Sequence, residues 1–191
     1  MQRRINTLFG TTLLAAATFA SAEPVSYTID ASHTSVVSES RHFGTSTIRT
    51  RFAAKNGTVT IDTAAKTGMA DITIDMTSTL TGIVELDAKL KSISMFDAPG
   101  YPEASFVSKA FTFTGDKVAA ISGDLTMHGK TNPVTLKSTN FNCYASPLLK
   151  KQVCGGDFET TVQRSLWDVK YLIPLVSDDT RLLIQVEAVK D

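Results

Sequence analysis

The sequence lacks several features, and each absence excludes a class of protein. Beyond its first 22 residues it has no apolar run of about 20 residues, the length that a transmembrane helix requires. It has no basic run interleaved with aromatic residues and no polybasic patch, so neither nucleic acid nor an anionic lipid surface is an expected partner. It also lacks internal repeats and low-complexity linkers, so 191 residues predict one folded domain.

The N-terminal segment has the order of a secretory signal peptide. Arg3 and Arg4 precede an apolar run, residues 8–20, which ends in Ala20-Ser21-Ala22. We expect cleavage after Ala22, export to the periplasm, and a mature domain of residues 23–191. An uncleaved membrane anchor is the alternative, and the shortness of the apolar run disfavours it.

Only two cysteines are present, Cys143 and Cys154. In an exported protein such a close pair predicts a disulfide, with free thiols as the alternative. Closing this loop stabilises a fold by about 3 kcal/mol on the chain-entropy estimate. No histidine lies near the pair in the sequence, so no zinc site is expected there.

The dominant hydrophobic period is two residues, which predicts antiparallel strands. In residues 70–77 the apolar and polar side chains alternate, and residues 182–188 place apolar side chains on one face against Leu183, Gln185 and Glu187 on the other. Asn56-Gly57 predicts a hairpin turn, and "SDDT" at residues 177–180 reads as another turn. Apolar residues at helical spacing predict one short helix, about Glu85 to Ser92. A mainly β sandwich or barrel follows.

Five ordered segments resemble the YceI-like family of polyisoprenoid-binding proteins. They are "YTIDASHTSV", "RHFGTSTIRTRF", "LKSISMFDAPGYPEASFVS", "GDLTMHGKTNPVTL", and "VQRSLWDV" followed by "VSDDTRLLIQVEA". The similarity covers essentially residues 27–188. It implies a mainly β fold, an extended antiparallel lipocalin-like β-barrel of about eight strands with one short helix. It also implies that the lumen holds a polyprenyl phosphate, a quinone or a similar amphiphile.

Serines occupy two positions that bear directly on that lumen. Where the family usually carries an aromatic and an aliphatic residue, this chain has Ser38 and Ser40. Val36, Ser38, Ser40 and His42 share one strand face, and we expect this face to point inward. The opposite choice would bury the charges of Glu39 and Arg41, which is costly. The lumen is therefore expected to be partly polar, with room for a ligand head group or ordered water.

The histidines do not predict a metal site. His33 and His42 are nine residues apart, so on an unbulged strand they point to opposite faces. After Asp30, His33 is expected to order the first turn through side-chain to backbone hydrogen bonds. His42 either orders a turn at the barrel rim or bonds a ligand head group.

The remaining candidates are basic or aromatic residues. Arg49 and Arg164 suit a phosphate, and an ion pair, with Asp168 or another carboxylate, is the equal alternative. Trp167 stacks on a ligand or, as we favour, packs in the core. The candidate ligand contacts in the lumen or at its mouth are Ser38, Ser40, His42, Phe43, Arg49, Phe52, Leu86, Leu90, Phe96, Phe106, Arg164 and Trp167.

These residues favour a binding protein over an enzyme. We expect no catalytic residue, no metal and no required cofactor, and an isoprenoid lipid or quinone as the bound partner. One alternative is an accessory protein that docks transiently on an inner-membrane redox complex of the cytochrome b type. A hydrolase or isomerase using His33 or His42 as a base is the other, and no nucleophile motif supports it. Pairing through an edge strand would give a homodimer.

Overall fold

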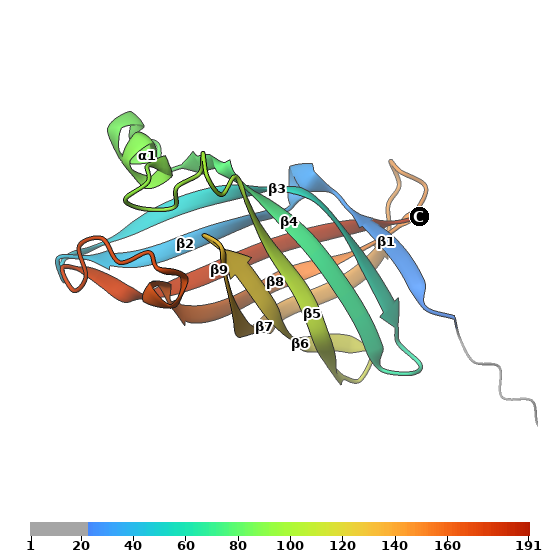
Figure 1. Ribbon diagram of the computed structural model, residues 1–191. Coiled ribbons are helices and arrows are strands. Elements are labelled where there is room, and N and C mark those ends of the chain that lie inside the picture. The colour runs from blue at the N-terminus through green and yellow to red at the C-terminus, as the bar shows by residue number, and fades with distance from the viewer. Residues whose placement is uncertain (1–22) are drawn as a thin grey trace, which may run out of the picture.

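The computed structural model describes residues 23–191, which form one closed antiparallel β-barrel (Figure 1). The predicted signal peptide, residues 1–22, lies outside the described residues. The strands, the helix and the two short 3₁₀ helices follow in chain order: β1 (Val25–Ile29), η1 (Ala31–His33), β2 (Ser35–His42), β3 (Ser46–Asp62), β4 (Thr67–Leu80), α1 (Val84–Lys91), β5 (Glu103–Thr114), β6 (Lys117–Met127), β7 (Lys130–Ala145), β8 (Gln152–Gln163), η2 (Arg164–Trp167) and β9 (Val176–Lys190).

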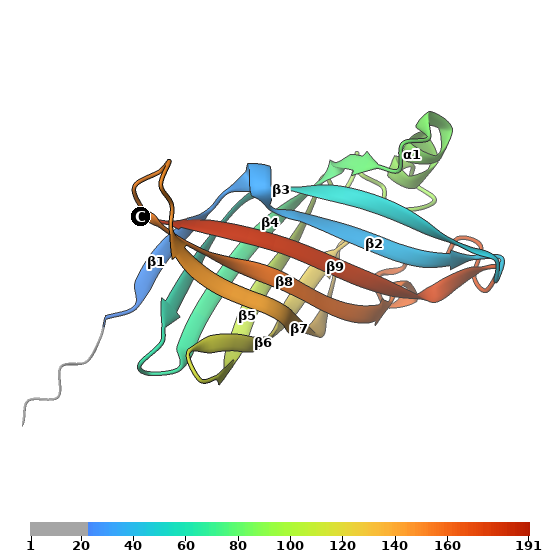
Figure 2. The same cartoon turned by 180° about the vertical axis from the view of Figure 1, so that it is seen from behind.

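Eight strands, β2 to β9, make the barrel wall. The sheet runs β3-β2-β9-β8-β7-β6-β5-β4, and a long antiparallel pairing of β3 with β4 closes it. The first strand, β1, pairs with the same two neighbours as β2, namely β3 and β9. It therefore continues the line of β2 toward the other end of the barrel, with η1 between them (Figures 1 and 2). Closure removes the exposed edges that an open sheet would have. The predicted fold class is thus confirmed.

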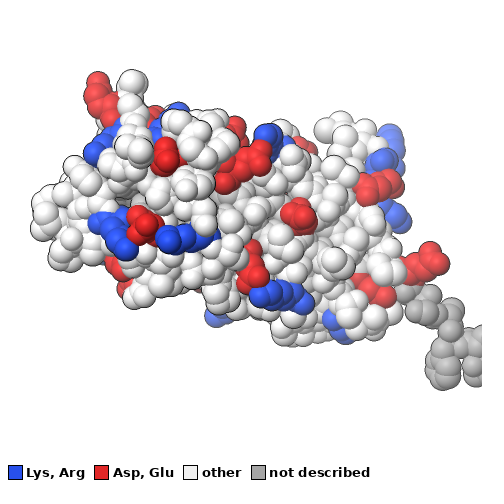
Figure 3. Space-filling view, viewed as in Figure 1, with Lys and Arg blue, Asp and Glu red and all other residues white. Residues whose placement is uncertain are grey.

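Inward-facing apolar side chains form two packed clusters inside the barrel. The larger cluster is centred on buried side chains such as Tyr27, Val118, Phe141 and Phe158. A smaller cluster consists of Phe52, Met76, Ala98 and Ala104. Acidic and basic side chains are dispersed over the face shown in Figure 3. Burying an apolar side chain of this size contributes about 1.5–3 kcal/mol, so alternating strands suffice to specify which face turns inward.

The predicted helix is present and covers one end of the barrel. It runs from Val84 to Lys91, within a residue of the expected bounds. The Asp87 carboxylate accepts hydrogen bonds from the backbone N–H and the hydroxyl of Thr81, both at 2.6 Å, and so fixes the approach to the first turn. Leu90 is buried against the barrel, whereas Val84 is 78% exposed. None of the helices in residues 23–191 has the length and apolar character that crossing a bilayer requires.

The predicted disulfide is formed. Cys143 and Cys154 are direct partners in the β7–β8 ladder, with their Cα atoms 4.1 Å apart. The bond ties the two strands just before the hairpin that joins them. The side chains of Leu148 and Leu149 lie at the exposed tip of this hairpin.

Two predicted turns are wrong. Asn56 and Gly57 lie inside β3 beside a bulge, and β3 turns into β4 only after Asp62. Gly57 serves close packing here, because a Cβ at this position would lie 2.7 Å from the Asp71 carbonyl oxygen. The segment from Ser177 to Thr180 belongs to strand β9, next to an irregularity in the β2–β9 register.

Candidate ligand-binding cavity

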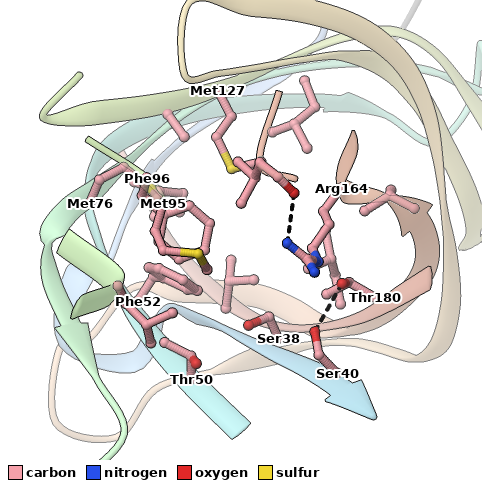
Figure 4. Close-up of a pocket in the computed structure, with 18 of the residues that line it drawn as sticks. Ser38, Ser40, Thr50, Phe52, Met76, Met95, Phe96, Met127, Arg164 and Thr180 are labelled. Atoms are coloured by element: carbon pink, nitrogen blue, oxygen red, sulfur yellow. Dashed lines mark hydrogen bonds between the residues drawn. The ribbon is translucent and has the colours of Figure 1, made fainter. Parts of the chain in front are cut away.

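The barrel encloses a cavity of about 390 Å³ beneath α1, a size typical of small-molecule sites (Figure 4). Its wall comes from β2 to β9, from α1, and from the segments that follow α1 and η2. The lining residues are Val36, Ser38, Ser40, His42, Ile48, Thr50, Phe52, Ile72, Ile74, Met76, Leu86, Lys89, Leu90, Met95, Phe96, Ala104, Phe106, Leu125, Met127, Val134, Leu136, Val162, Arg164, Val169, Tyr171, Leu172, Val176, Thr180, Leu182 and Ile184.

Most of this wall is hydrocarbon, thioether or aromatic. Met76, Met95 and Met127 all border the cavity (Figure 4). The ring centres of Phe52 and Phe96 lie 5.5 Å apart, with the rings arranged edge to face. Methionine side chains are flexible and polarizable, so they adapt to ligands of irregular shape. No aspartate or glutamate of residues 23–191 lines the space. The cavity therefore suits an apolar chain.

A second, smaller cavity of about 70 Å³ lies next to the first, toward Tyr27 and Phe141. Its wall is apolar side chain apart from the hydroxyls of Tyr27 and Thr34. Six residues border both cavities and form the constriction between them: Val36, Ile72, Ile74, Phe106, Leu136 and Ile184. The lumen thus narrows but continues beyond the main cavity.

Four hydroxyl side chains break the apolar wall on neighbouring strands β3, β2 and β9. Ser38 on β2 stands directly across from Thr50 on β3, and Ser40 stands across from Thr180 on β9. The hydroxyls of Ser40 and Thr180 are 3.0 Å apart and hydrogen-bonded. Figure 4 shows all four side chains at the cavity wall. The inward face predicted for Val36, Ser38, Ser40 and His42 is confirmed, because all four line the cavity.

The hydroxyls of the other pair, Ser38 and Thr50, differ from those of Ser40 and Thr180 in their hydrogen bonding. Within residues 23–191 no protein atom hydrogen-bonds the hydroxyl of either residue, although Thr50 is only 4% exposed. Every fully enclosed side-chain nitrogen or oxygen in that range has a partner, so these two oxygens border the cavity space. Because both oxygens face the cavity, a polar group inside it can hydrogen-bond them directly.

Arg164 lies in the wall, and four of the five N–H donors of its guanidinium are already used. Its guanidinium donates to four backbone carbonyls, those of Val169, Tyr171, Val176 and Ser177, at 2.7–3.0 Å. Burial lowers the pKa of Arg164 from its ordinary value, and the nearby Asp178 carboxylate opposes that shift. An ion pair with Asp168, one of the alternatives for this residue, is not formed, and Asp168 pairs with Lys170 instead. Arg164 thus organises the segment between η2 and β9.

Nine of the twelve predicted contacts line the cavity: Ser38, Ser40, His42, Phe52, Leu86, Leu90, Phe96, Phe106 and Arg164. Their role in binding stays a prediction. Three others do not line it. Phe43 is 52% exposed in the β2–β3 turn, where its backbone takes a φ of 49°. Arg49 faces outward because its strand neighbours Ile48 and Thr50 face inward, and it pairs with Glu39 at 2.8 Å.

Trp167, the third, is a core residue, the alternative that the sequence favoured. It is 1% exposed, and its indole N–H donates to the Leu125 carbonyl at 3.0 Å. The His128 ring bonds the Trp167 carbonyl, also at 3.0 Å. These contacts tie η2 to the β6–β7 hairpin. Lining residues that sequence reasoning missed include Met95, Met127, Tyr171 and Thr180, whose positions depend on how distant strands and loops close over one another.

Neither His33 nor His42 forms an acid–base pair with a nucleophilic side chain in the lumen. His33 lies in the exposed turn η1, outside the cavity, where its Nδ1 is 2.8 Å from an Asp30 carboxylate oxygen and 3.1 Å from the Ser32 hydroxyl. Both contacts use the same ring nitrogen, so the three residues cannot relay a proton from serine through histidine to aspartate. The His33 ring contacts side chains here, and not the backbone as was predicted for it; the side-chain to backbone bond of the turn runs from the Ser32 N–H to the Asp30 carboxylate, at 2.9 Å.

The comparisons with known proteins agree with this geometry. A UPF0312 protein of Pseudomonas putida (strain GB-1) is 38% identical over 189 residues, which is 95% of this chain and 93% of the relative. The crystal structure of Burkholderia cenocepacia BcnA matches with a TM-score of 0.66 and 25% identity, over 84% of this chain and 99% of BcnA.

A polyisoprenoid binding domain from Saccharophagus degradans shares the fold, with a TM-score of 0.61 and 14% identity over 87% of this chain and 99% of that domain. The model of the YceI-like domain matches residues 27–188, nearly the whole described range. This chain therefore belongs to the YceI-like family.

Proposed function

We propose that this protein binds an isoprenoid lipid, a quinone or a similar amphiphile in its barrel lumen and carries it through the periplasm. The observation behind the proposal is the cavity of about 390 Å³ inside a closed barrel, with a wall that is mostly hydrocarbon. A prenyl chain in water is costly to hydrate, and each buried methylene contributes about 0.8 kcal/mol. One five-carbon unit then contributes about 4 kcal/mol before the costs of immobilisation.

Two further observations support the ligand class and the compartment. The Saccharophagus degradans domain, described as polyisoprenoid-binding, has the same fold, and it supports this ligand class by analogy. The disulfide between Cys143 and Cys154 agrees with export, because such bonds persist in oxidising compartments. The residues before Glu23 carry the signal-peptide pattern.

The test is native mass spectrometry of the protein purified from periplasm, followed by extraction and identification of the bound molecule. A stoichiometric prenyl lipid or quinone on a chain that starts at Glu23 would support both parts of the proposal. An apo mass that takes up neither quinones nor polyprenyl phosphates on incubation would refute the binding role. A chain that retains residues 1–22 would refute export with cleavage.

A second candidate is an accessory protein that docks beside a membrane redox complex. It is favoured by apolar side chains left exposed on and around α1: Ile83 is 56% exposed, Val84 78% and Ile93 81%. Exposed apolar groups in such a cluster often mark a contact surface. Val84→Glu combined with Ile93→Glu would abolish cross-linking to a membrane partner and leave ligand binding intact if docking is the main role.

A further inference from the structure

The unpartnered hydroxyls of Ser38 and Thr50 mark a polar position inside an otherwise apolar lumen. They stand across from each other on β2 and β3, and each oxygen borders the cavity. The bonded pair of Ser40 and Thr180 lies one inward step along β2, so four hydroxyls share one patch of wall. Hydroxyls both donate and accept, so this patch suits a carbonyl or a hydroxyl on the ligand.

Charge around the patch is the second observation. Among residues 23–191, three basic side chains border the cavity, and each of them is engaged by groups other than Ser38 and Thr50. The Arg164 guanidinium is committed to four carbonyls. The Lys89 ammonium lies 3.9 Å from the centre of the Tyr171 ring and donates to Ser94. His42 lies beyond Ser40 at the end of β2, against the Phe43 ring.

An anionic head group would be expensive at this position. Burying a phosphate requires a paired cation or a dense set of hydrogen bonds, and a few hydroxyls do not replace the water that it loses. An uncharged polar group loses much less on leaving water, and the two open hydroxyls can compensate it directly. The position beside Ser38 and Thr50 therefore favours an uncharged head group over an anionic one, through both charge and hydrogen bonding.

We propose that Ser38 and Thr50, flanked by Ser40 and Thr180, form a subsite for an uncharged head group of an amphiphile, a carbonyl or a hydroxyl. The subsite discriminates against a phosphate on the same apolar chain. This inference rests on the proposed function, because it assigns the polar end of the ligand whose tail fills the rest of the cavity. Ser38 and Thr50 make the primary contacts, since the Ser40 and Thr180 hydroxyls already share a hydrogen bond.

The experiment compares binding of three matched prenyl ligands and ubiquinone by isothermal titration. The matched set is a polyprenol, the polyprenyl monophosphate and the hydrocarbon of the same chain length. Wild-type protein should bind the alcohol and the quinone about tenfold tighter than the phosphate. Thr50→Val and Ser38→Ala should each weaken alcohol and quinone binding about five- to tenfold, the effect of one lost hydrogen bond, and leave hydrocarbon binding within twofold.

Thr47→Val is the matched control, because Thr47 lies on β3 facing outward, opposite Arg41. It should change none of the affinities. Thr50→Val should unfold at or above the wild-type temperature, since its hydroxyl has no protein partner to lose. If Thr50→Val does not fold, that expectation is wrong, and Ser38→Ala carries the binding comparison.

Three results would overturn the inference while leaving lipid binding intact. They are equal or tighter binding of the phosphate, wild-type affinities in both variants, or an equal loss of hydrocarbon binding. Failure of the wild-type protein to bind any ligand, the hydrocarbon included, would overturn the proposed function and the subsite together.

Discussion

The ammonium group of Lys89 lies 3.9 Å from the centre of the Tyr171 ring. Lys89 belongs to α1, and Tyr171 belongs to the segment between η2 and β9, so the contact joins two parts of the chain that are far apart in sequence. Both side chains line the cavity. A cation over an aromatic face is worth about 0.5–1 kcal/mol at an exposed site. The contact thus holds α1 against the segment that follows η2, over the lumen.

Removing this contact should speed ligand release. Lys89→Met keeps the aliphatic stem and removes the charge, so the dissociation rate of a bound quinone is expected to rise about two- to fivefold. Stopped-flow displacement measures that rate directly. Lys91→Met is the control, because Lys91 lies on the same helix and does not line the cavity. Equal release rates in wild type and Lys89→Met would show that the contact does not restrain the ligand.

The Arg164 guanidinium should be essential for stability. Arg164→Met leaves up to four carbonyls without their donor, so the free energy of unfolding is expected to fall by about 3 kcal/mol or more. Arg164→Lys should restore little, because an ammonium group cannot reproduce the planar fork. Urea denaturation followed by circular dichroism gives the values.

A surface arginine provides the comparison for that experiment. Arg49 pairs with Glu39 on the outer face, with 65% of the arginine side chain exposed. Arg49→Met should cost less than about 1 kcal/mol, as exposed ion pairs do. Similar losses at Arg164 and Arg49 would contradict the structural role assigned to Arg164.

The disulfide should contribute measurably to stability. Cys143 and Cys154 are separated by 11 residues in the sequence, and cross-linking such a loop restricts the unfolded chain by an amount worth about 3 kcal/mol. Replacing both cysteines by serine should lower the melting temperature by about 5–10 °C. Calorimetry tests this, and an unchanged melting temperature in the double variant would refute it.

The Asp30–His33 contact predicts a defined pH dependence of the η1 turn. Hydrogen bonds from Ser32 and His33 lower the Asp30 pKa to about 2, and the hydrogen bond to Asp30 raises the His33 pKa above its ordinary value of 6.5. The histidine contribution is complete below pH 6.5 and is lost as pH rises through the raised pKa. The aspartate contribution is complete above about pH 4 and is lost as pH falls toward 2.

The turn should therefore be most stable between about pH 4 and pH 6.5. A proton NMR titration of His33 in wild type and in Asp30→Asn checks the pairing. The variant should show a lower His33 pKa, closer to 6.5. Identical titration curves would mean that Asp30 does not set the protonation of His33.

The two-residue hydrophobic period predicted the strands and some of the residues that line the cavity. Alternation put Ser38, Ser40 and His42 on one face, and the cost of burying Glu39 and Arg41 on the other identified that face as the inward one. Alternation placed Met76 on one face of its strand in the same way. The family resemblance added the closed barrel, which alternation by itself could not separate from a sandwich.

Long-range geometry explains what the sequence did not predict. Asn56-Gly57 has the local signature of a hairpin, but the pairing of β3 with β4 and the close approach of Asp71 placed Gly57 inside a strand. The lumen position of Tyr171 depends on how Arg164 folds the segment after η2, and nothing local to Tyr171 encodes that. Phe43 was expected in the lumen from its apolar character alone, and the turn leaves it exposed.

Methionine methyl NMR tests lipid binding in the lumen most directly. Met76, Met95 and Met127 line the cavity, whereas Met69 is 69% exposed on the outside and serves as an internal control. Titrating ¹³C-methyl-labelled protein with a polyprenol should shift the three cavity signals, saturating at one ligand per chain, and leave the Met69 signal in place. Shifts confined to Met69, or no shift at saturating ligand, would contradict binding inside the barrel.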